Sequence, residues 1–174
     1  VCCIASVCVL VYTMHTGTSF IYMMGHFPAP FGNEIRAGAL EGLMATFFSV
    51  IMLLALLGGD KYLRVDMEKV KQNLYYALIN LLLSSLHALI YTNDLFTAYV
   101  FVEINTIAAG GLIMIRSNGH SILAATKYMI MSLLGSGWLL IGISLQYDLT
   151  GHLLMENIHD SVAVLDANGA VRQR

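Results

Sequence analysis

The stretch NDLFTAYVFVEINTIAAGGLIMI, residues 93–115, decides the fold because it is long and apolar enough to cross a bilayer. A spanning helix needs about 20 mostly apolar residues. One carboxylic acid, Glu103, follows the start of the apolar run at Leu95 by 8 residues, which places it about 12 Å deep. An acid at that depth costs at least about 2.5 kcal/mol to bury, so we expect it to face protein or a hydrated path rather than lipid.

The composition of the whole chain indicates an integral membrane protein. Only 11% of its 174 residues are charged and 57% are hydrophobic, whereas a soluble domain has roughly 25% charged residues. The net charge of -2 provides no basic surface for nucleic acid, so no nucleic-acid partner is expected. The three cysteines, Cys2, Cys3 and Cys8, all lie in the first apolar run, which is typical of apolar packing rather than of a disulfide framework.

Hydropathy predicts an all-α fold, a polytopic transmembrane helix bundle with about five spans visible. Residues 1–148 form this bundle, and residues 149–174 are expected to be an extracytoplasmic loop that leads to a next helix outside the chain. Because the chain starts without Met or a basic segment, we expect a fragment of a longer protein rather than a signal peptide. The predicted spans are residues 1–14 (partial), 37–58, 73–92, 95–115 and 121–147.

The distribution of basic residues predicts the orientation of the spans. Loops 59–72 and 116–120 together hold five Lys and Arg residues, whereas the opposite loop 15–36 holds only Arg36 and the turn at 93–94 holds none. Cytoplasmic loops carry the excess of basic residues. Loops 59–72 and 116–120 are therefore predicted to be cytoplasmic. The basic residues counted are Lys61, Arg64, Lys69, Lys71 and Arg116.

The segment GHFPAPFGNE, residues 25–34, contains both prolines of the chain. Pro, Gly and aromatic residues in this pattern predict a rigid turn at the outer interface. A plain connection between spans and a binding role both remain open for it.

Three ionisable residues within the spans, Glu103, Lys127 and His87, are the candidates for a proton relay. Lys127 follows Ser121 by 6 residues, so it lies about 9 Å from the cytoplasmic edge and could extend its ammonium group to the interface. Counted from the same edge, Glu103 lies about 18 Å deep. This difference of depth argues against a direct ion pair and favours titrating groups linked by water or by other segments.

His87 and two further polar residues complete the candidate set. His87 stands near the outer end of its span, where a role in packing and a role in the relay are both open. Tyr99, one turn before Glu103, and Asn105 are expected to support the carboxyl group by hydrogen bonding. Glu41 lies about one turn inside its span and is expected to reach the interface.

The sequence contains none of the common catalytic or nucleotide-binding motifs of soluble enzymes. It has no HExxH pair, no Gly-rich phosphate loop and no GxSxG turn. We therefore predict no catalytic, cofactor-binding or metal-binding residues and no cofactor for this chain. An intramembrane enzyme would need a nucleophile or a metal-binding group at one depth, and the spans offer neither.

The motif DLFTAYVFVEINTIAAGGLI resembles the fifth spanning helix of the antiporter-like family. That family comprises the proton-translocating membrane subunits of respiratory complex I, the D-type subunits of Mrp cation/proton antiporters, and their relatives in membrane-bound hydrogenases. The resemblance implies that Glu103 is the essential intramembrane acid of the family. The matching positions are Asp94, Leu95, Phe96, Tyr99, Val100, Phe101 and Glu103.

Two further motifs extend the resemblance over nearly the whole chain. TKYMIMSLLGSGWLLIGISLQYDLTGHLLMENI resembles the following helix and loop, and GHFPAPFG is similar to the outer loop of Mrp D-type subunits. The chain departs from the family at residues 38–41, where an Asp followed by Leu-Ser is usual. The matching positions in the second motif are Lys127, Tyr128, Gly142, Tyr147, Thr150, Gly151 and Leu153.

The resemblance implies a protein of about 14 transmembrane helices, of which this chain is the N-terminal part, ending before a seventh helix with a further lysine. The implied function is proton or cation/proton translocation as one subunit of a multisubunit complex in the cell membrane. Its implied partners are other membrane subunits, the lipid bilayer, protons and, as a second candidate ion, Na+. A non-conducting structural or assembly subunit is the alternative. The sequence leaves open whether the complex is an antiporter, a hydrogenase or a quinone reductase.

Overall fold

The computed structural model describes residues 2–24, 33–66 and 68–172, and most of these residues are helical. The elements follow the order α1 (Cys2–Thr16), β1 (Phe20–Met23), β2 (Glu34–Ala37), α2 (Ala39–Asp66), α3 (Lys69–Tyr91), α4 (Leu95–Met114), α5 (Gly119–Thr150) and α6 (Met155–Arg172).

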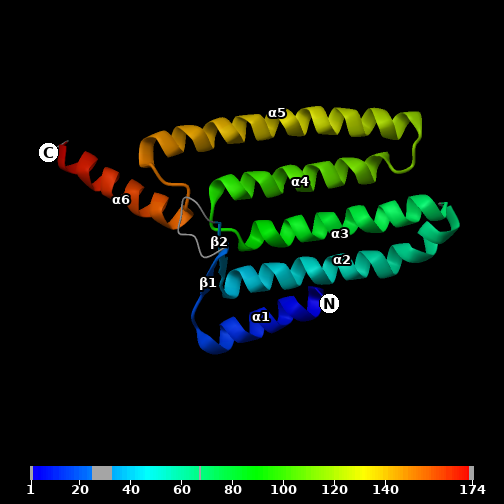
Figure 1. Ribbon diagram of the computed structural model, residues 1–174, viewed down its shortest axis with the longest axis horizontal. Helices are drawn as coiled ribbons and strands as arrows, with labels where there is room; N and C mark the ends of the chain where they lie inside the picture. Colours follow the sequence, from blue (N-terminus) through cyan, green and yellow to red (C-terminus); the bar gives the residue numbers. More distant parts are fainter. Residues whose placement is uncertain (1, 25–32, 67, 173–174) are drawn as a thin grey trace.

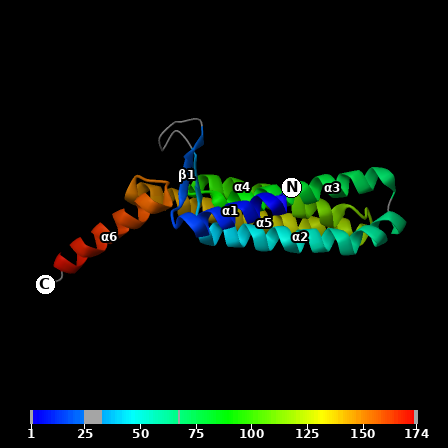
Figure 2. The ribbon, with the colours of Figure 1, turned by 90° about the horizontal axis from the view of Figure 1, so that it is seen from below.

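Helices α1 to α5 lie side by side in chain order, and each packs against the next (Figures 1 and 2). Only 11% to 17% of the residues in each long span are buried within the chain. Most of the helix surface is therefore left to contact lipid or other polypeptides.

Four helices are long and apolar enough to span a membrane, and α1, with 15 residues, is shorter. The predicted helical bundle, with four full spans and one partial span, is therefore confirmed. The helix ends differ from the prediction, because α2 continues to Asp66 and α3 begins at Lys69. The predicted loop 59–72 is thus mostly helical. Hydropathy marks where lipid contact ends, whereas Lys, Arg and Leu continue a helix readily in water.

A short β-hairpin at one end of the bundle was not predicted. Strands β1 and β2 pair antiparallel, with Phe20 opposite Ala37 and Met23 opposite Glu34. The strand residues FIYM are aromatic, β-branched or apolar, which suits a strand as well as it suits a span. The proline-containing part of the predicted rigid turn, residues 25–32, lies outside the described residues.

Backbone hydrogen bonds join the hairpin to two other segments at the same end of the bundle. Ile35 forms a β-bridge with Thr92, and Asp94 forms one with Leu154. The Asn93 backbone lies between them, because its N–H donates to the Glu34 carbonyl at 3.0 Å and its carbonyl accepts from the Met155 N–H at 3.0 Å. These bonds fix the point at which α4 begins.

The segment 149–174, predicted as an extracytoplasmic loop that leads to a next helix, contains the helix α6. The helix α5 ends at Gly151, which has φ +70°, a backbone conformation that side chains other than Gly rarely adopt. The chain then turns, and α6 points away from the bundle (Figures 1 and 2). Because α6 is rich in polar residues, a search for apolar runs does not find it.

Gly42 lets α1 and α2 approach closely. A Cβ atom at this position would lie 3.2 Å from the Leu10 Cα atom, which belongs to the backbone of α1 and cannot move aside alone. Gly58, on the same helix α2, has nothing within 4 Å of the corresponding position.

We expect Gly42→Val to push α1 away from α2 and to destabilise the protein by about 1–3 kcal/mol, the usual effect of overpacking. The measurement is the apparent Tm of the whole protein in detergent. Gly58→Val is the matched control and should leave the Tm near that of the wild type. Equal effects of the two variants would contradict the close approach.

Candidate functional site

Glu103 lies on α4, whose start is fixed by its cap. The Asp94 side chain accepts a hydrogen bond from the Phe96 N–H at 3.3 Å and from the Thr97 hydroxyl at 2.6 Å. From this cap, α4 carries Glu103 to a cavity of about 300 Å³ between α4 and α5. Thr106 and Ser132 line the cavity together with apolar side chains.

One oxygen of the Glu103 carboxyl group, Oε1, is buried and has no hydrogen-bond partner. A buried carboxylate without a partner is costly, and the cost falls when the group binds a proton or contacts a polar ligand. The structure thus places an acid with one unpartnered carboxyl oxygen at a cavity between two spans.

Lys127 is exposed on α5 and does not line this cavity. In the antiparallel pair of α4 and α5, a Cβ at Gly110 would lie 3.1 Å from the Met129 Cγ atom, so Lys127 stands near the level of Gly111. It is thus separated from Glu103 by about 8 residues, or 12 Å, along the helix axis. No ion pair joins Lys127 to Glu103 within the part of the chain that the structure describes.

Neither Tyr99 nor Asn105 contacts the Glu103 carboxyl group through a hydrogen bond. The Tyr99 ring packs against Phe96, with ring centroids 6.3 Å apart. The Asn105 Oδ1 atom accepts a weak hydrogen bond from Ser85 of α3 at 3.5 Å. Asn105 follows Glu103 by two residues, which turns it to another face of the helix. The expected support of the carboxyl group by these two residues is thus absent from the structure.

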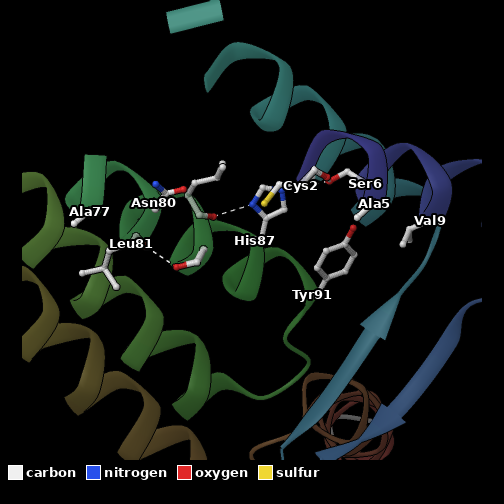
Figure 3. Close-up of a pocket in the computed structure, with 11 residues that line it drawn as sticks. Cys2, Ala5, Ser6, Val9, Ala77, Asn80, Leu81, His87 and Tyr91 are labelled. Carbon is white, nitrogen blue, oxygen red and sulfur yellow. Dashed lines mark hydrogen bonds between the residues drawn. The ribbon is translucent and has the colours of Figure 1, made fainter. Parts of the chain in front are cut away.

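His87 lies in a separate polar cluster formed by α1, α2 and α3. Its Nε2 atom is 2.8 Å from the Ser49 hydroxyl and 3.4 Å from the Ser6 hydroxyl, and the two hydroxyl oxygens are 3.2 Å apart. The ring lines a cavity of about 710 Å³ between α1 and α3, which is also lined by Cys2 and Tyr91 (Figure 3). The structure therefore does not bring His87 to Glu103.

Sequence reasoning missed Ser6 and Ser49. Both serines stand in the middle of apolar runs, and this position was the available signal that they could have polar partners on other helices. A serine in such a run normally bonds to a carbonyl of its own helix, as Ser84 does to Leu81, so the signal is weak without the tertiary contacts.

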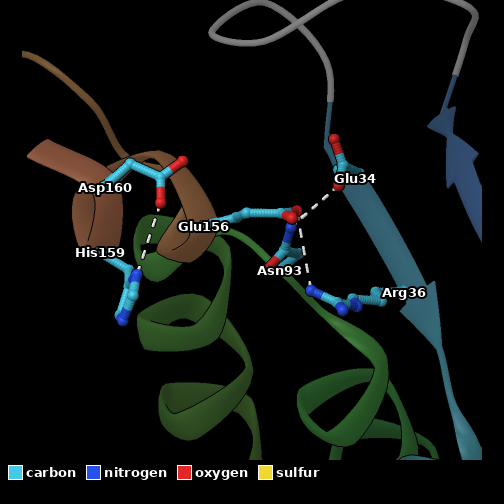
Figure 4. Close-up of polar contacts among 6 residues, drawn as sticks. All are labelled: Glu34, Arg36, Asn93, Glu156, His159 and Asp160. Atoms are coloured by element: carbon cyan, nitrogen blue, oxygen red, sulfur yellow. Dashed lines mark hydrogen bonds and ion pairs between the residues drawn. The ribbon is translucent and has the colours of Figure 1, made fainter. Parts of the chain in front are cut away.

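Charged residues gather at the hairpin end of the bundle, around a cavity of about 580 Å³. Arg36 of β2 forms an ion pair with Glu156 of α6 at 3.6 Å, and the Asn93 side chain donates to Glu34 at 2.9 Å (Figure 4). Glu41 also lines this cavity.

Glu41 stands at the start of α2, where the prediction placed it, and its Oε2 atom accepts from the Gly38 N–H at 3.0 Å. Among residues 2–24, 33–66 and 68–172, no group of three or more His, Cys, Asp or Glu side chains could hold a metal ion.

Comparison with known proteins identifies the family of residues 92–171. Residues 92–171, which include α4, Glu103 and α5, match the family described as NADH:quinone oxidoreductase/Mrp antiporter, TM. Residues 92–171 belong to this antiporter-like family. The resemblance that the sequence motifs indicated is confirmed.

The similarity extends over most of the chain. The N-type subunit of NADH-quinone oxidoreductase from Desulforudis audaxviator (strain MP104C) is 32% identical over 86% of this chain and 29% of the relative. The D-type subunit of a probable K(+)/H(+) antiporter from Rhizobium meliloti (strain 1021) is 30% identical over 85% of this chain and 26% of the relative. The D-type subunit of the Na(+)/H(+) antiporter from Bacillus subtilis (strain 168) is 27% identical over 94% and 32%.

Solved structures share the arrangement of the helices. A chain of the membrane-bound sulfane sulfur reductase, an archaeal respiratory membrane complex, superimposes with a TM-score of 0.81 at 29% identity, over 90% of this chain and 31% of that one. A chain of the Mrp complex from Dietzia sp. DQ12-45-1b superimposes with a TM-score of 0.72 at 22% identity, over 93% and 32%, and shows the fold alone.

The chain thus spans between 26% and 32% of the length of these relatives and structures. It is a multi-pass membrane chain whose residues 92–171 belong to the antiporter-like family, and its similar structures are parts of membrane complexes.

Proposed function

We propose that this chain is part of a proton-translocating, antiporter-like subunit of a multisubunit complex in the cell membrane, and that Glu103 carries the proton. The observation that supports this most directly is the buried Oε1 atom of Glu103, which faces a cavity between two spans without a hydrogen-bond partner. Residues 92–171, which contain Glu103, match the family described as NADH:quinone oxidoreductase/Mrp antiporter, TM, and this match supports a role in ion movement.

The physical argument depends on the difference between the two charge states of Glu103. A neutral carboxyl group tolerates a cavity with mainly apolar walls, whereas a carboxylate there needs water or a polar neighbour. Movement of a charge or of water into the cavity would therefore change the proton affinity of Glu103, and proton release would follow. This coupling is what a translocating subunit requires.

Lys127 and His87 enter the proposal as further titratable groups at other depths. Because neither contacts Glu103, their link to it would run through water or through helices of other segments. The proposed partners are other membrane subunits, lipid, protons and, as a second candidate ion, Na+. We propose no cofactor for this chain.

The proposed orientation places residues 59–72 and 116–120 in the cytoplasm. The basic residues of these segments support it. The β-hairpin and the start of α6, at the opposite ends of the helices, would then lie on the outer side (Figure 1).

Glu103→Gln should leave the complex assembled and reduce ion transport to the background leak. The amide keeps the shape of the side chain but binds no proton near neutral pH. General acid–base groups contribute about a hundredfold or more, so the loss should be large. The measurement is proton flux in membrane vesicles that contain the whole complex, with assembly followed by native gel migration.

Glu156→Gln is the matched control, since it makes the same chemical change at an exposed acid of α6, and it should retain transport. Normal transport by Glu103→Gln would reject the relay. Failure of the variant complex to assemble would favour the alternative, a structural or assembly subunit.

Lys127→Ala should impair transport less than Glu103→Gln, by about two- to fivefold, as expected for an exposed charge outside the cavity. The same vesicle assay measures it. A loss equal to that of Glu103→Gln would contradict the peripheral position of Lys127.

The orientation can be tested with single cysteines in a variant that lacks Cys2, Cys3 and Cys8. In right-side-out vesicles, a membrane-impermeant maleimide should label His152→Cys at once, and Lys69→Cys only after permeabilisation, because the two positions would lie on opposite sides. Both native side chains are exposed and lie outside the proposed relay. The reverse labelling pattern would overturn the orientation.

A further inference from the structure

The geometry around His87 fixes which of its ring nitrogens carries hydrogen. The Nδ1 atom lies 2.8 Å from the Leu83 carbonyl oxygen. A carbonyl oxygen only accepts hydrogen bonds, so Nδ1 must be the donor. In the neutral ring, Nε2 is then an acceptor, and the Ser49 hydroxyl at 2.8 Å donates to it.

Three contacts in a row lead from Nε2 to the backbone of α1. They are Nε2 to Ser49 at 2.8 Å, Ser49 to Ser6 at 3.2 Å, and Ser6 to the Cys2 carbonyl oxygen at 2.9 Å. With a neutral ring, the two hydroxyl groups supply two hydrogens for these three contacts. One contact must then bring two lone-pair atoms together without a hydrogen between them.

A proton on Nε2 removes this deficit. The ring then donates to Ser49, Ser49 donates to Ser6, and Ser6 donates to the Cys2 carbonyl oxygen. Each of the three contacts holds one hydrogen, and both N–H groups of the charged ring have an acceptor. Hydrogen bonds from a charged donor are also about twice as strong as those between neutral groups.

We propose that His87, Ser49 and Ser6 form a proton-binding site that is separate from the Glu103 cavity. A hydronium ion from the cavity water gives its proton to the lone pair of Nε2: one O–H bond of the hydronium breaks, an N–H bond forms, the ring becomes a cation and a water molecule is left. Its occupied form joins α3, α2 and α1 through one continuous chain of hydrogen bonds. His87 binds the proton, and the two serines are positioning residues.

The surroundings of the site allow water to reach the ring but provide no counter-ion in contact with it. Ser49 and Ser6 are only 1% and 4% exposed, whereas His87 is half-buried and lines the cavity of about 710 Å³ with the polar residues Asn80 and Ser84. Glu41 precedes Ser49 by 8 residues, which is about 12 Å along α2. The charged ring would therefore be stabilised by the hydroxyl and carbonyl dipoles.

Several titratable or charged residues stand on the elements packed around the site. They include Cys2, Cys3, Cys8, Tyr12 and His15 on α1, Glu41 and Asp60 on α2, Lys69, Lys71, Tyr75, Tyr76 and Tyr91 on α3, Tyr99 and Glu103 on α4, and Glu34 and Arg36 on β2. None of them is a hydrogen-bond partner of the His87 ring, whose partners are Leu83, Ser49 and Ser6. The site rests on the proposed function only in taking His87 as a titratable group. Its test can fail while proton transport through Glu103 stands, because the Glu103→Gln variant tests that transport separately.

The test is the slow exchange of the imidazole C2 hydrogen for deuterium, followed by mass spectrometry of the whole complex over the pH range in which histidine titrates. This exchange gives a pH midpoint for each histidine. Ser6→Ala leaves the neutral ring its bond from Ser49 but breaks the chain that the charged ring requires. The midpoint of His87 should therefore move to lower pH by about one unit.

Two controls make the result specific. Ser84→Ala removes another hydroxyl from the same cavity, one that bonds to Leu81 of its own helix, and should leave the midpoint of His87 unchanged. Ser6→Thr keeps the hydroxyl and should keep the wild-type midpoint. If Ser6→Ala does not assemble, Ser6→Cys, a weaker hydrogen-bonding group of similar size, should shift the midpoint in the same direction.

An unchanged midpoint in Ser6→Ala, or in Ser6→Cys where that variant replaces it, would overturn the proposal. Equal shifts in Ser84→Ala and the Ser6 variant would do the same, because the effect would then come from the cavity rather than from the chain. Absence of exchange at His87 in the wild-type protein would also overturn it, since water would not reach the ring.

Discussion

The structure depends on one constraint, that a polar group inside a bilayer must find its partner within the protein. Most hydroxyl groups of the spans meet it locally, as Thr13, Thr46 and Thr126 do by bonding to carbonyl groups one turn earlier on their own helices. Glu103 does not, because the carbonyls of its helix cannot accept from a carboxylate. Glu103 is therefore a residue that needs a cavity.

The position of that acid is set at the end of the bundle. The backbone of Asn93 bonds to Glu34 on one side and to Met155 on the other, and the next residue, Asp94, caps α4. Glu103 then follows about two and a half helical turns later, with its Oε1 atom unpaired. The capped start of α4 thus fixes the location of Glu103, and its Oε1 atom lies there without a hydrogen-bond partner.

The sequence was sufficient to predict the spans, and it also singled out Glu103. Both predictions depend on the hydropathy of the chain, because a helix that crosses lipid must be mostly apolar. It was insufficient for the hairpin and α6, because the FIYM strand is as apolar as a span and α6 is not apolar. Ser6, Ser49 and His87 are separated by 38 to 81 residues in the chain, so only the packing of three helices brings them together. The two residues expected to support Glu103 take other contacts, since Tyr99 packs on Phe96 of its own helix and Asn105 accepts a hydrogen bond from Ser85 of α3.

The length of α5 has a mechanical consequence. Its 32 residues measure about 48 Å, whereas the hydrocarbon layer of a bilayer is about 30 Å thick. The helix must tilt or emerge from the lipid, and the fit depends on the thickness of the membrane. Since Leu154, just after α5, pairs with Asp94, a thinner or thicker bilayer would pull on the first turn of α4. The thickness of the membrane, which depends on lipid composition, would in this way act on the helix that carries Glu103.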